Sequence, residues 1–139
     1  MTEPKRLSPN ISVCPQVMPH ELDALADAGF RSIICNRPDN EDAGQPNWPE
    51  IARAAEAAGM HVRHIPVTPG EITDEDVARF KAALGELPGP VLAYCRSGGR
   101  AASLWALSNP ESLAPDELVG TAADAGYDLS KLRDRLVQP

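Results

Sequence analysis

The segment Cys95-Arg96-Ser97-Gly98-Gly99-Arg100 brings a thiol, two guanidinium groups and two adjacent glycines into one short stretch of chain. Residues 90–95 before it form an apolar run typical of a buried strand, and residues 100–107 have the pattern of a helix. A cysteine between a strand end and a helix start is suited to reactivity, because the helix N-terminus favours negative charge. The sequence therefore predicts Cys95 as a nucleophile.

The rest of this loop predicts an anion-binding site around that nucleophile. A free thiol is only about 3% thiolate at pH 7, and a helix terminus alone contributes about 0.3–2 kcal/mol to a nearby anion. Gly98 and Gly99 permit a sharp turn that aims backbone N–H groups inward, and Arg100 or Arg96 adds positive charge. We expect an exposed thiol, with Arg96, Ser97, Gly98 and Gly99 binding substrate. The alternative is a buried cysteine before an ordinary glycine turn, which would need neither arginine.

A second candidate group follows an earlier predicted strand. Arg37 and Asp39 come directly after residues 31–36, and would open on the same rim as Cys95 if the two strands are parallel. Arg37 could then bind an anionic substrate while Asp39 holds it in place. A surface turn with a local ion pair explains the same residues.

The histidines and cysteines predict no metal site. His61 and His64 are three residues apart on a predicted strand, so their side chains point to opposite faces. Cys14, Cys35 and Cys95 match neither a zinc knuckle nor a disulfide scaffold. We expect no metal and no cofactor.

These residues are positioned by alternating strands and helices. The pattern predicts a mainly parallel four-stranded α/β sheet with helices on both faces, in which ligands bind at the carboxyl ends of the strands. The predicted strands are residues 11–13, 31–36, 61–67 and 90–95, and the predicted helices are about 19–28, 49–58, 74–87, 100–107, 115–125 and 129–137. Residues 1–10 are expected to be an N-terminal tail and residues 11–139 a single domain.

Helix ends are marked by local signals. Gly29, Gly59 and Gly126 each follow a helical run and precede an apolar residue, which is the pattern of a Schellman stop. Thr73 and Asp76 have the spacing of an acidic capping box at the start of the helix near residue 74.

Composition limits the partners and the location. The chain has 139 residues, a formal net charge of −7 and an isoelectric point near 4.9, so a general attraction to nucleic acid or acidic membranes is not expected. No apolar signal core or membrane span is evident, so a cytoplasmic location is expected.

The loop from Cys95 to Arg100 resembles the active loop of single-domain rhodaneses, which accept sulfane sulfur on cysteine. Residues 89–100, together with 36–39, 57–59 and 65–67, resemble the bacterial beta-lactamase hydrolase-like family. The resemblance covers residues 11–107. That family is described as a phosphatase-like domain with the fold of dual-specificity phosphatases, and is often classed as a sulfurtransferase.

The resemblance leaves two activities for one pocket, sulfur transfer and phosphate-ester hydrolysis. The spacing of the loop favours sulfur transfer. Phosphatases of that fold have five residues between cysteine and arginine, whereas Arg100 follows Cys95 after four, with Ala101 at the expected arginine position. They also use an aspartic acid after the third strand to protonate the leaving oxygen. Only Glu71 and Asp74 match that segment, and Asp74 belongs to the first turn of a helix, so Glu71 is the candidate general acid. Persulfide transfer between thiols needs no such acid.

We therefore expect a sulfurtransferase in which Cys95 carries sulfane sulfur as a persulfide. The expected small anionic sulfur donor is thiosulfate or a low-molecular-weight persulfide, the acceptor is a thiol, and a persulfide dioxygenase is a candidate partner. The alternative is a phosphatase acting through a phosphocysteine. A module that only binds anions is the third hypothesis.

Cys35 is a candidate resolving thiol. It ends a predicted strand as Cys95 does, and adjacent strands are about 4.8 Å apart, which permits a disulfide if the two strands are neighbours. The resemblance supports this role, because some phosphatases of that fold protect their nucleophile with a second cysteine. A small core residue is the alternative, and is slightly favoured.

Overall fold

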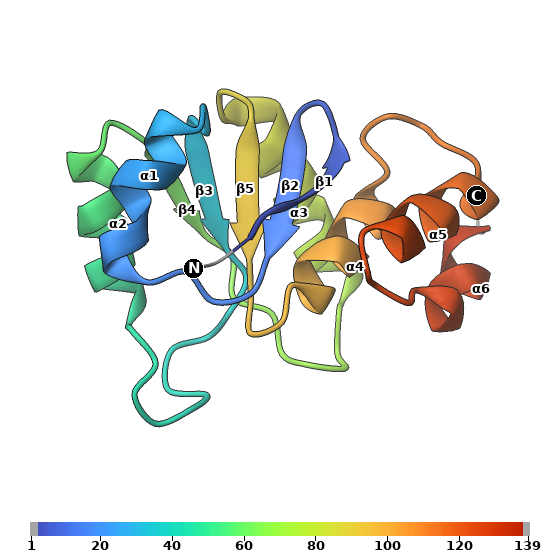
Figure 1. Ribbon diagram of the computed structural model, residues 1–139. Coiled ribbons are helices and arrows are strands. Elements are labelled where there is room, and N and C mark those ends of the chain that lie inside the picture. Colours follow the sequence, from blue (N-terminus) through green and yellow to red (C-terminus); the bar gives the residue numbers. More distant parts are fainter. Residues whose placement is uncertain (1–2, 138–139) are drawn as a thin grey trace.

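A five-stranded sheet forms the centre of the computed structural model, which describes residues 3–137 (Figure 1). Its spatial order is β1-β2-β5-β3-β4. β2 pairs with β5, and β3 pairs with both β5 and β4, all in parallel, whereas β1 pairs with β2 antiparallel. The strands are β1 (Lys5–Ser8), β2 (Ile11–Cys14), β3 (Ser32–Cys35), β4 (His61–His64) and β5 (Val91–Tyr94). The predicted α/β class is confirmed, but the sheet is mixed.

The strand β1 corrects two expectations. The sequence predicts four strands, and it places residues 5–8 in an N-terminal tail. In the structure these residues form an edge strand joined to β2 by a short turn. Only Leu7 of β1 is buried in the core, so the strand has little hydrophobic pattern of its own. Its pairing with β2 supplies the hydrogen bonds that its sequence does not reveal.

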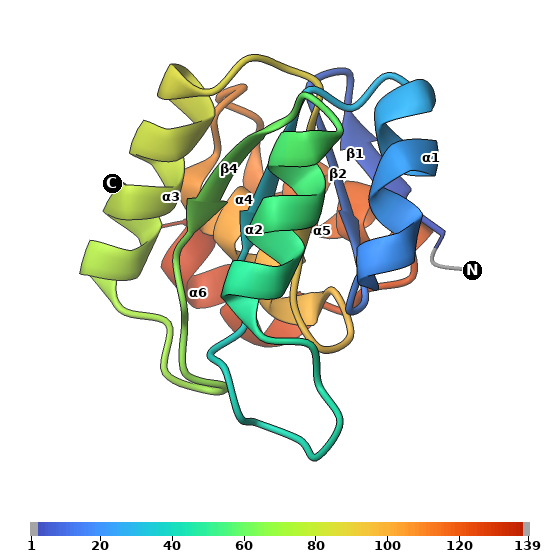
Figure 2. The same ribbon diagram turned by 90° about the vertical axis from the view of Figure 1, so that its left-hand side faces the viewer.

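Helices cover both faces of this sheet, as predicted. α1 and α2 lie on one face, and α3, α4 and α5 pack on the other (Figures 1 and 2). The elements are η1 (Pro19–Glu21), α1 (Leu22–Asp27), α2 (Trp48–Ala57), α3 (Asp74–Glu86), α4 (Gly99–Ser108), α5 (Pro115–Asp124), η2 (Ser130–Leu132) and α6 (Arg133–Leu136).

The expected helix signals are present at their ends. The capping box at α3 is complete, since the Thr73 hydroxyl accepts from the Asp76 N–H and the Asp76 carboxylate accepts from the Thr73 N–H, each at 3.0 Å. Gly126 ends α5 with φ near +100°, a conformation that favours glycine. The same turn directs the chain back towards the sheet at Tyr127.

The carboxyl ends of the parallel strands meet at one edge of the sheet. Three loops gather there, at the lower edge in Figure 1: residues 36–47 after β3, residues 65–73 after β4 and residues 95–98 after β5. The three loops follow the adjacent strands β5, β3 and β4, with β3 between the other two. This edge is where the candidate residues of the sequence come together.

Candidate active site

Cys95 lies directly after β5 and is held by its own loop. Its side chain is almost fully buried, with 1% of the residue exposed, so the expectation of an exposed thiol is wrong. The Gly98 N–H donates to the Cys95 Sγ at 3.1 Å, and Gly98 reaches this position with φ near +97°. The loop thus closes over the sulfur, and one of its backbone N–H groups is placed where it would stabilise a negative charge.

The carbonyl groups of this loop are held from outside. The Arg96 carbonyl accepts from the Gln16 N–H at 3.4 Å, and the Ser97 carbonyl accepts from the Tyr127 hydroxyl at 3.1 Å. The Gly98 carbonyl accepts from the Ala102 N–H at 2.9 Å, and the Gly99 carbonyl accepts from the Ser103 hydroxyl at 2.8 Å. Gln16 and Tyr127 hold the loop from other segments of the chain, whereas Ala102 and Ser103 belong to the first turns of α4, which continues it. The sharp turn that Gly98 and Gly99 predict is present in the loop.

Arg100 is bound to a carboxylate that the sequence did not single out. Its two terminal nitrogens donate to the two Glu41 carboxylate oxygens at 2.7 and 2.8 Å, and Nη1 also donates to the Val67 carbonyl at 2.9 Å. The hydrogen bond from Arg100 holds the pKa of Glu41 below its ordinary value, with a smaller contribution from Arg37 and against the effect of burial. An incoming anion must therefore share Arg100 with Glu41.

Arg37 is engaged in a second set of contacts rather than free for substrate. It is 4% exposed, and it donates to Glu41 at 2.9 Å, to the Gln16 side chain at 2.9 Å and to Asp42 at 2.5 Å. Asp42 also lies 3.0 Å from the Arg96 guanidinium. The predicted substrate contact of Arg37 stays a prediction. Its ion pairs with Glu41 and Asp42 agree with one part of the alternative, but Arg37 is buried and does not lie in a surface turn.

Asp39 does not hold Arg37. Its carboxylate instead accepts from the Trp48 N–H at 2.8 Å, at the start of α2. This contact satisfies a backbone donor that the helix itself leaves without a partner. Asp39 therefore fixes the end of the loop that carries Glu41.

The candidate general acid lies on a loop that reaches the site. Glu71 is exposed in the loop after β4, whereas its neighbours Pro69 and Gly70 line the hollow beside Arg100. Asp74 begins α3, as the sequence predicts, and pairs with Arg135 at 3.3 Å. Asp74 is thus engaged at the start of α3, and the general-acid role of Glu71 stays a prediction.

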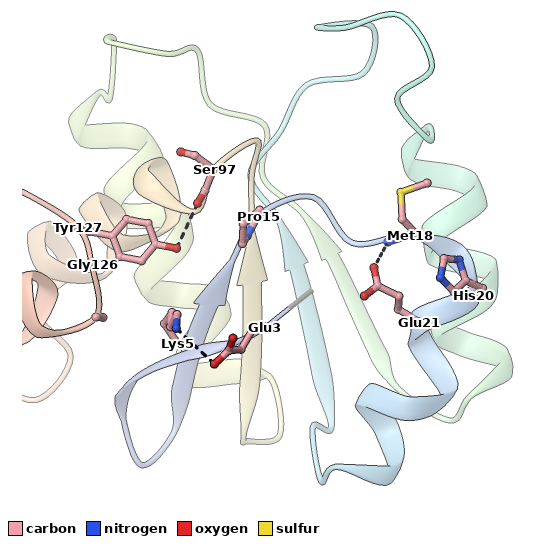
Figure 3. Close-up of a pocket in the computed structure, with 10 residues that line it drawn as sticks. Glu3, Lys5, Pro15, Met18, His20, Glu21, Ser97, Gly126 and Tyr127 are labelled. Carbon is pink, nitrogen blue, oxygen red and sulfur yellow. Dashed lines mark hydrogen bonds and ion pairs between the residues drawn. The ribbon is translucent and has the colours of Figure 1, made fainter. Parts of the chain in front are cut away.

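Three hollows surround the loop. One of about 420 Å³ is lined by Glu41, Arg96, Ser97 and Arg100, and is the approach to the anion-binding groups. A second of about 330 Å³ extends from Arg100 along the C-terminal segment to Leu132 and Arg135. The third, of about 710 Å³, opens between Ser97 and Tyr127 on one side and Met18 and His20 on the other (Figure 3). Ser97 is shared by the first and third hollows, and Tyr127 by the second and third.

The two other cysteines flank the same strand. Cys14 and Cys35 are paired in register with Tyr94, on β2 and β3 respectively, so the neighbouring strands that a latch requires are present. Cys35, however, packs in the core beneath α1 and α2, and its Sγ lies 3.3 Å from the Arg37 carbonyl. Burial raises the pKa of the Cys35 thiol to about 11. This environment favours a core residue, and the resolving role stays a prediction.

Neither a metal cluster nor a membrane span is found in the described part of the chain. Within residues 3–137, no group of three or more His, Cys, Asp or Glu side chains could hold a metal ion. No helix in that range is long and apolar enough to cross a membrane.

Comparisons with known proteins agree with this fold. Residues 4–112 match the family model described as "Beta-lactamase hydrolase-like protein, phosphatase-like domain". The Beta-lactamase hydrolase-like protein of Agrobacterium fabrum is 39% identical over 73% of the chain, which spans only 24% of that protein. The chain thus corresponds to about a quarter of the length of this relative.

Solved structures extend the likeness to the cysteine phosphatases. A Neisseria meningitidis protein classed as a candidate phosphatase is 36% identical, with a TM-score of 0.85 and coverage of 95% of this chain and 94% of that one. Kinase associated phosphatase has a TM-score of 0.71 at 15% identity, covering 100% and 97%, which shows a shared fold. These names support a phosphatase-like domain, and they favour the phosphatase alternative over sulfur transfer.

Proposed function

The chain belongs to the beta-lactamase hydrolase-like family, as its phosphatase-like domain, and from this premise we propose that it is a sulfurtransferase whose nucleophile is Cys95. The observation that carries the proposal is the loop itself. Four residues separate Cys95 from Arg100, the Gly98 N–H contacts the sulfur, and Arg100 is already paired with Glu41. Such a loop is suited to holding one additional sulfur atom on Cys95.

The reaction has two thiolate displacements. The Cys95 thiolate attacks the outer sulfur of thiosulfate; the S–S bond of the donor breaks, and sulfite leaves with the electron pair. A thiolate acceptor then attacks the outer sulfur of the Cys95 persulfide, which forms the acceptor persulfide and restores the Cys95 thiolate. No oxidant or reductant beyond donor and acceptor is needed.

The surroundings of Cys95 support this chemistry in a second way. Sulfite and thiolates leave as stable anions, so neither step needs a proton donor for an alkoxide. Glu41, the carboxylate bound to Arg100, has a lowered pKa and is a poor proton donor, and Glu71 is exposed in the loop after β4, which supports sulfur transfer over ester cleavage. The product persulfide would be a substrate for an oxidising enzyme, and a persulfide dioxygenase stays the expected partner.

Phosphate-ester hydrolysis through a phosphocysteine is the second candidate. It is favoured by the family description and by the fold shared with cysteine phosphatases. In that reaction the Cys95 thiolate would attack phosphorus and expel an alcohol, and water would then release phosphate. Arg100 would have to leave part of its contact with Glu41 to bind the phosphoryl oxygens.

Intact-protein mass spectrometry separates the two reactions. After exposure to thiosulfate we expect a gain of one sulfur atom, reversed by a thiol acceptor, and no gain in Cys95→Ser. Cys35→Ser is the matched control, because it replaces another strand-end cysteine and should keep the adduct.

Steady-state rates complete the comparison. We expect kcat/KM for thiol-dependent sulfur release from thiosulfate to exceed that for para-nitrophenyl phosphate. A faster phosphatase reaction, abolished by Cys95→Ser, would establish the second candidate instead. Sulfur adducts that form equally on Cys95→Ser would overturn sulfur transfer through Cys95.

A further inference from the structure

Tyr127 contacts the catalytic loop from a part of the chain that the family model does not include. That model ends at residue 112, whereas Tyr127 follows α5. The Tyr127 hydroxyl donates to the Ser97 carbonyl at 3.1 Å, and Figure 3 shows the ring lying beside the loop with its hydroxyl directed at Ser97. Burial raises the pKa of Tyr127, so the hydroxyl keeps its proton and remains a donor.

The carbonyl that Tyr127 holds belongs to the same peptide unit as the N–H that contacts the nucleophile. In a trans peptide the C=O and N–H groups point in opposite directions. The Ser97 carbonyl faces outward to Tyr127, so the Gly98 N–H faces inward, where it donates to Cys95 Sγ at 3.1 Å. The Tyr127 hydroxyl and the Cys95 sulfur are therefore hydrogen-bonded to the C=O and the N–H of the same peptide group.

This peptide plane needs such a restraint. Gly98 has φ near +97°, and glycine rotates more freely than any other residue. The neighbouring Gly99 N–H is already bound to the Ser97 side chain at 3.2 Å, so it does not replace the contact with sulfur. A Cβ on Gly98 would lie 2.1 Å from the Tyr127 hydroxyl, which shows how closely the ring packs on the turn.

We propose that Tyr127 is a positioning residue that orients the Ser97–Gly98 peptide so that its N–H stabilises the Cys95 thiolate. The inference rests on Cys95 being the nucleophile, as in the proposed function, but not on the identity of the donor. It assigns a role in catalysis to the segment after residue 112. The role is exerted through the backbone of the loop, without contact between Tyr127 and the reacting atoms.

The test removes only the hydroxyl, with Tyr127→Phe, and measures alkylation of Cys95 by iodoacetamide from pH 5 to 10. The site of reaction is read by peptide mass spectrometry. We expect the pH of half-maximal rate to rise by about one unit and the rate at pH 6 to fall about tenfold, the loss of one hydrogen bond to a charged group. Thr121→Val, a hydroxyl removed from α5 beside β1, is the control and should leave the profile unchanged.

A purely structural role for Tyr127 would lower the melting temperature without moving this pH profile, and that result would overturn the proposal. The orientation of the peptide is also measured directly by the Gly98 amide resonance in NMR spectra. It should shift markedly in Tyr127→Phe, and an unchanged resonance contradicts the proposal. Because neither readout uses a sulfur or phosphate substrate, failure of the proposed function leaves both results decisive.

Discussion

Beside Cys95, three guanidinium groups meet two carboxylates. Glu41 binds Arg100 and Arg37, and Asp42 binds Arg37 and Arg96. The cluster keeps a single excess positive charge, which a Cys95 thiolate would balance. The nearby arginines thus favour an anion at this site in a chain whose overall charge is −7. Both terminal nitrogens of Arg100 are bound to Glu41, so a ligand must compete with Glu41 for them.

Replacing Glu41 by Gln should destabilise the protein at neutral pH. The variant leaves Arg100, 10% exposed, without a carboxylate partner and leaves Arg37, 4% exposed, with Asp42 alone, so we expect a loss of about 2 kcal/mol in the free energy of unfolding at pH 7. Urea denaturation measures this loss. Glu86→Gln removes the exposed pair with Arg63 and, as the control, should cost less than about 1 kcal/mol.

The same pair predicts a pH dependence. Because Arg100 foremost holds the pKa of folded Glu41 below its ordinary value, its stabilisation is complete above that ordinary value. It is lost as the pH falls through the lower, folded-state pKa. Wild type and Glu41→Gln should therefore converge in stability in acid; a difference that persists there would mean that the carboxylate acts through shape rather than charge.

At the level of the loop and the start of α4, the two adjacent glycines have different requirements. Gly98→Ala forces an alanine to φ near +97° and places its Cβ against Tyr127, so we expect a loss of about 2 kcal/mol or more and slow alkylation of Cys95. Gly99→Ala is the matched control. Its Cβ meets only the Ser97 hydroxyl at 3.4 Å, and alanine favours the helix.

Thermal unfolding and the alkylation rate measure both variants. If Gly98→Ala and Gly99→Ala behave alike, the turn at Gly98 is not what fixes the sulfur. A large effect of Gly99→Ala alone would instead place the constraint in the first turn of α4.

The helices and buried strands were predictable because each carries its signal locally. The capping box at Thr73 and the stop at Gly126 lie within a few residues of the ends that they define. β1 was missed because its pattern is polar and its partner, β2, determines it. A strand at a sheet edge depends on pairing more than on its own residues.

The residues of the candidate site also divide into those that local sequence predicts and those that only the tertiary fold reveals. The loop from Cys95 to Arg100 was predictable because its residues are contiguous. Glu41 and Tyr127 were not, because each reaches the loop only through the tertiary fold. Tyr127 did carry one signal, the stop at Gly126 that turns the chain, but nothing in the sequence shows which residue that turn brings it to. The burial of Cys95 follows from the closure of the loop over the sulfur.

For the whole molecule, the segment after residue 112 is part of the main core. Leu118 of α5 is 1% exposed and packs in the cluster that contains Trp105 and Phe80. We expect Leu118→Ala to cost about 2–5 kcal/mol, because it leaves a cavity in a packed core. Val137→Ala, at a residue 56% exposed, is the control and should change stability by less than about 0.5 kcal/mol.

Chemical denaturation with a single transition would show that this segment unfolds together with the sheet. A separate early transition for α5 and α6, or a cost below about 1 kcal/mol for Leu118→Ala, would show a loosely attached segment. In that case the contact of Tyr127 with the loop would vary with the state of the segment.

β5 is bordered by a parallel strand on each side, and the loop that carries Cys95 leaves from its end. Amide hydrogens of Val91–Tyr94 should therefore exchange with solvent only when the whole domain opens, while those of the loop exchange through local motion. The strand that leads to Cys95 is thus expected among the slowest-exchanging segments of the molecule, and the loop after it among the faster-exchanging ones. A ligand that binds this loop should therefore alter deuterium uptake in residues 95–98 and leave uptake in β5 unchanged.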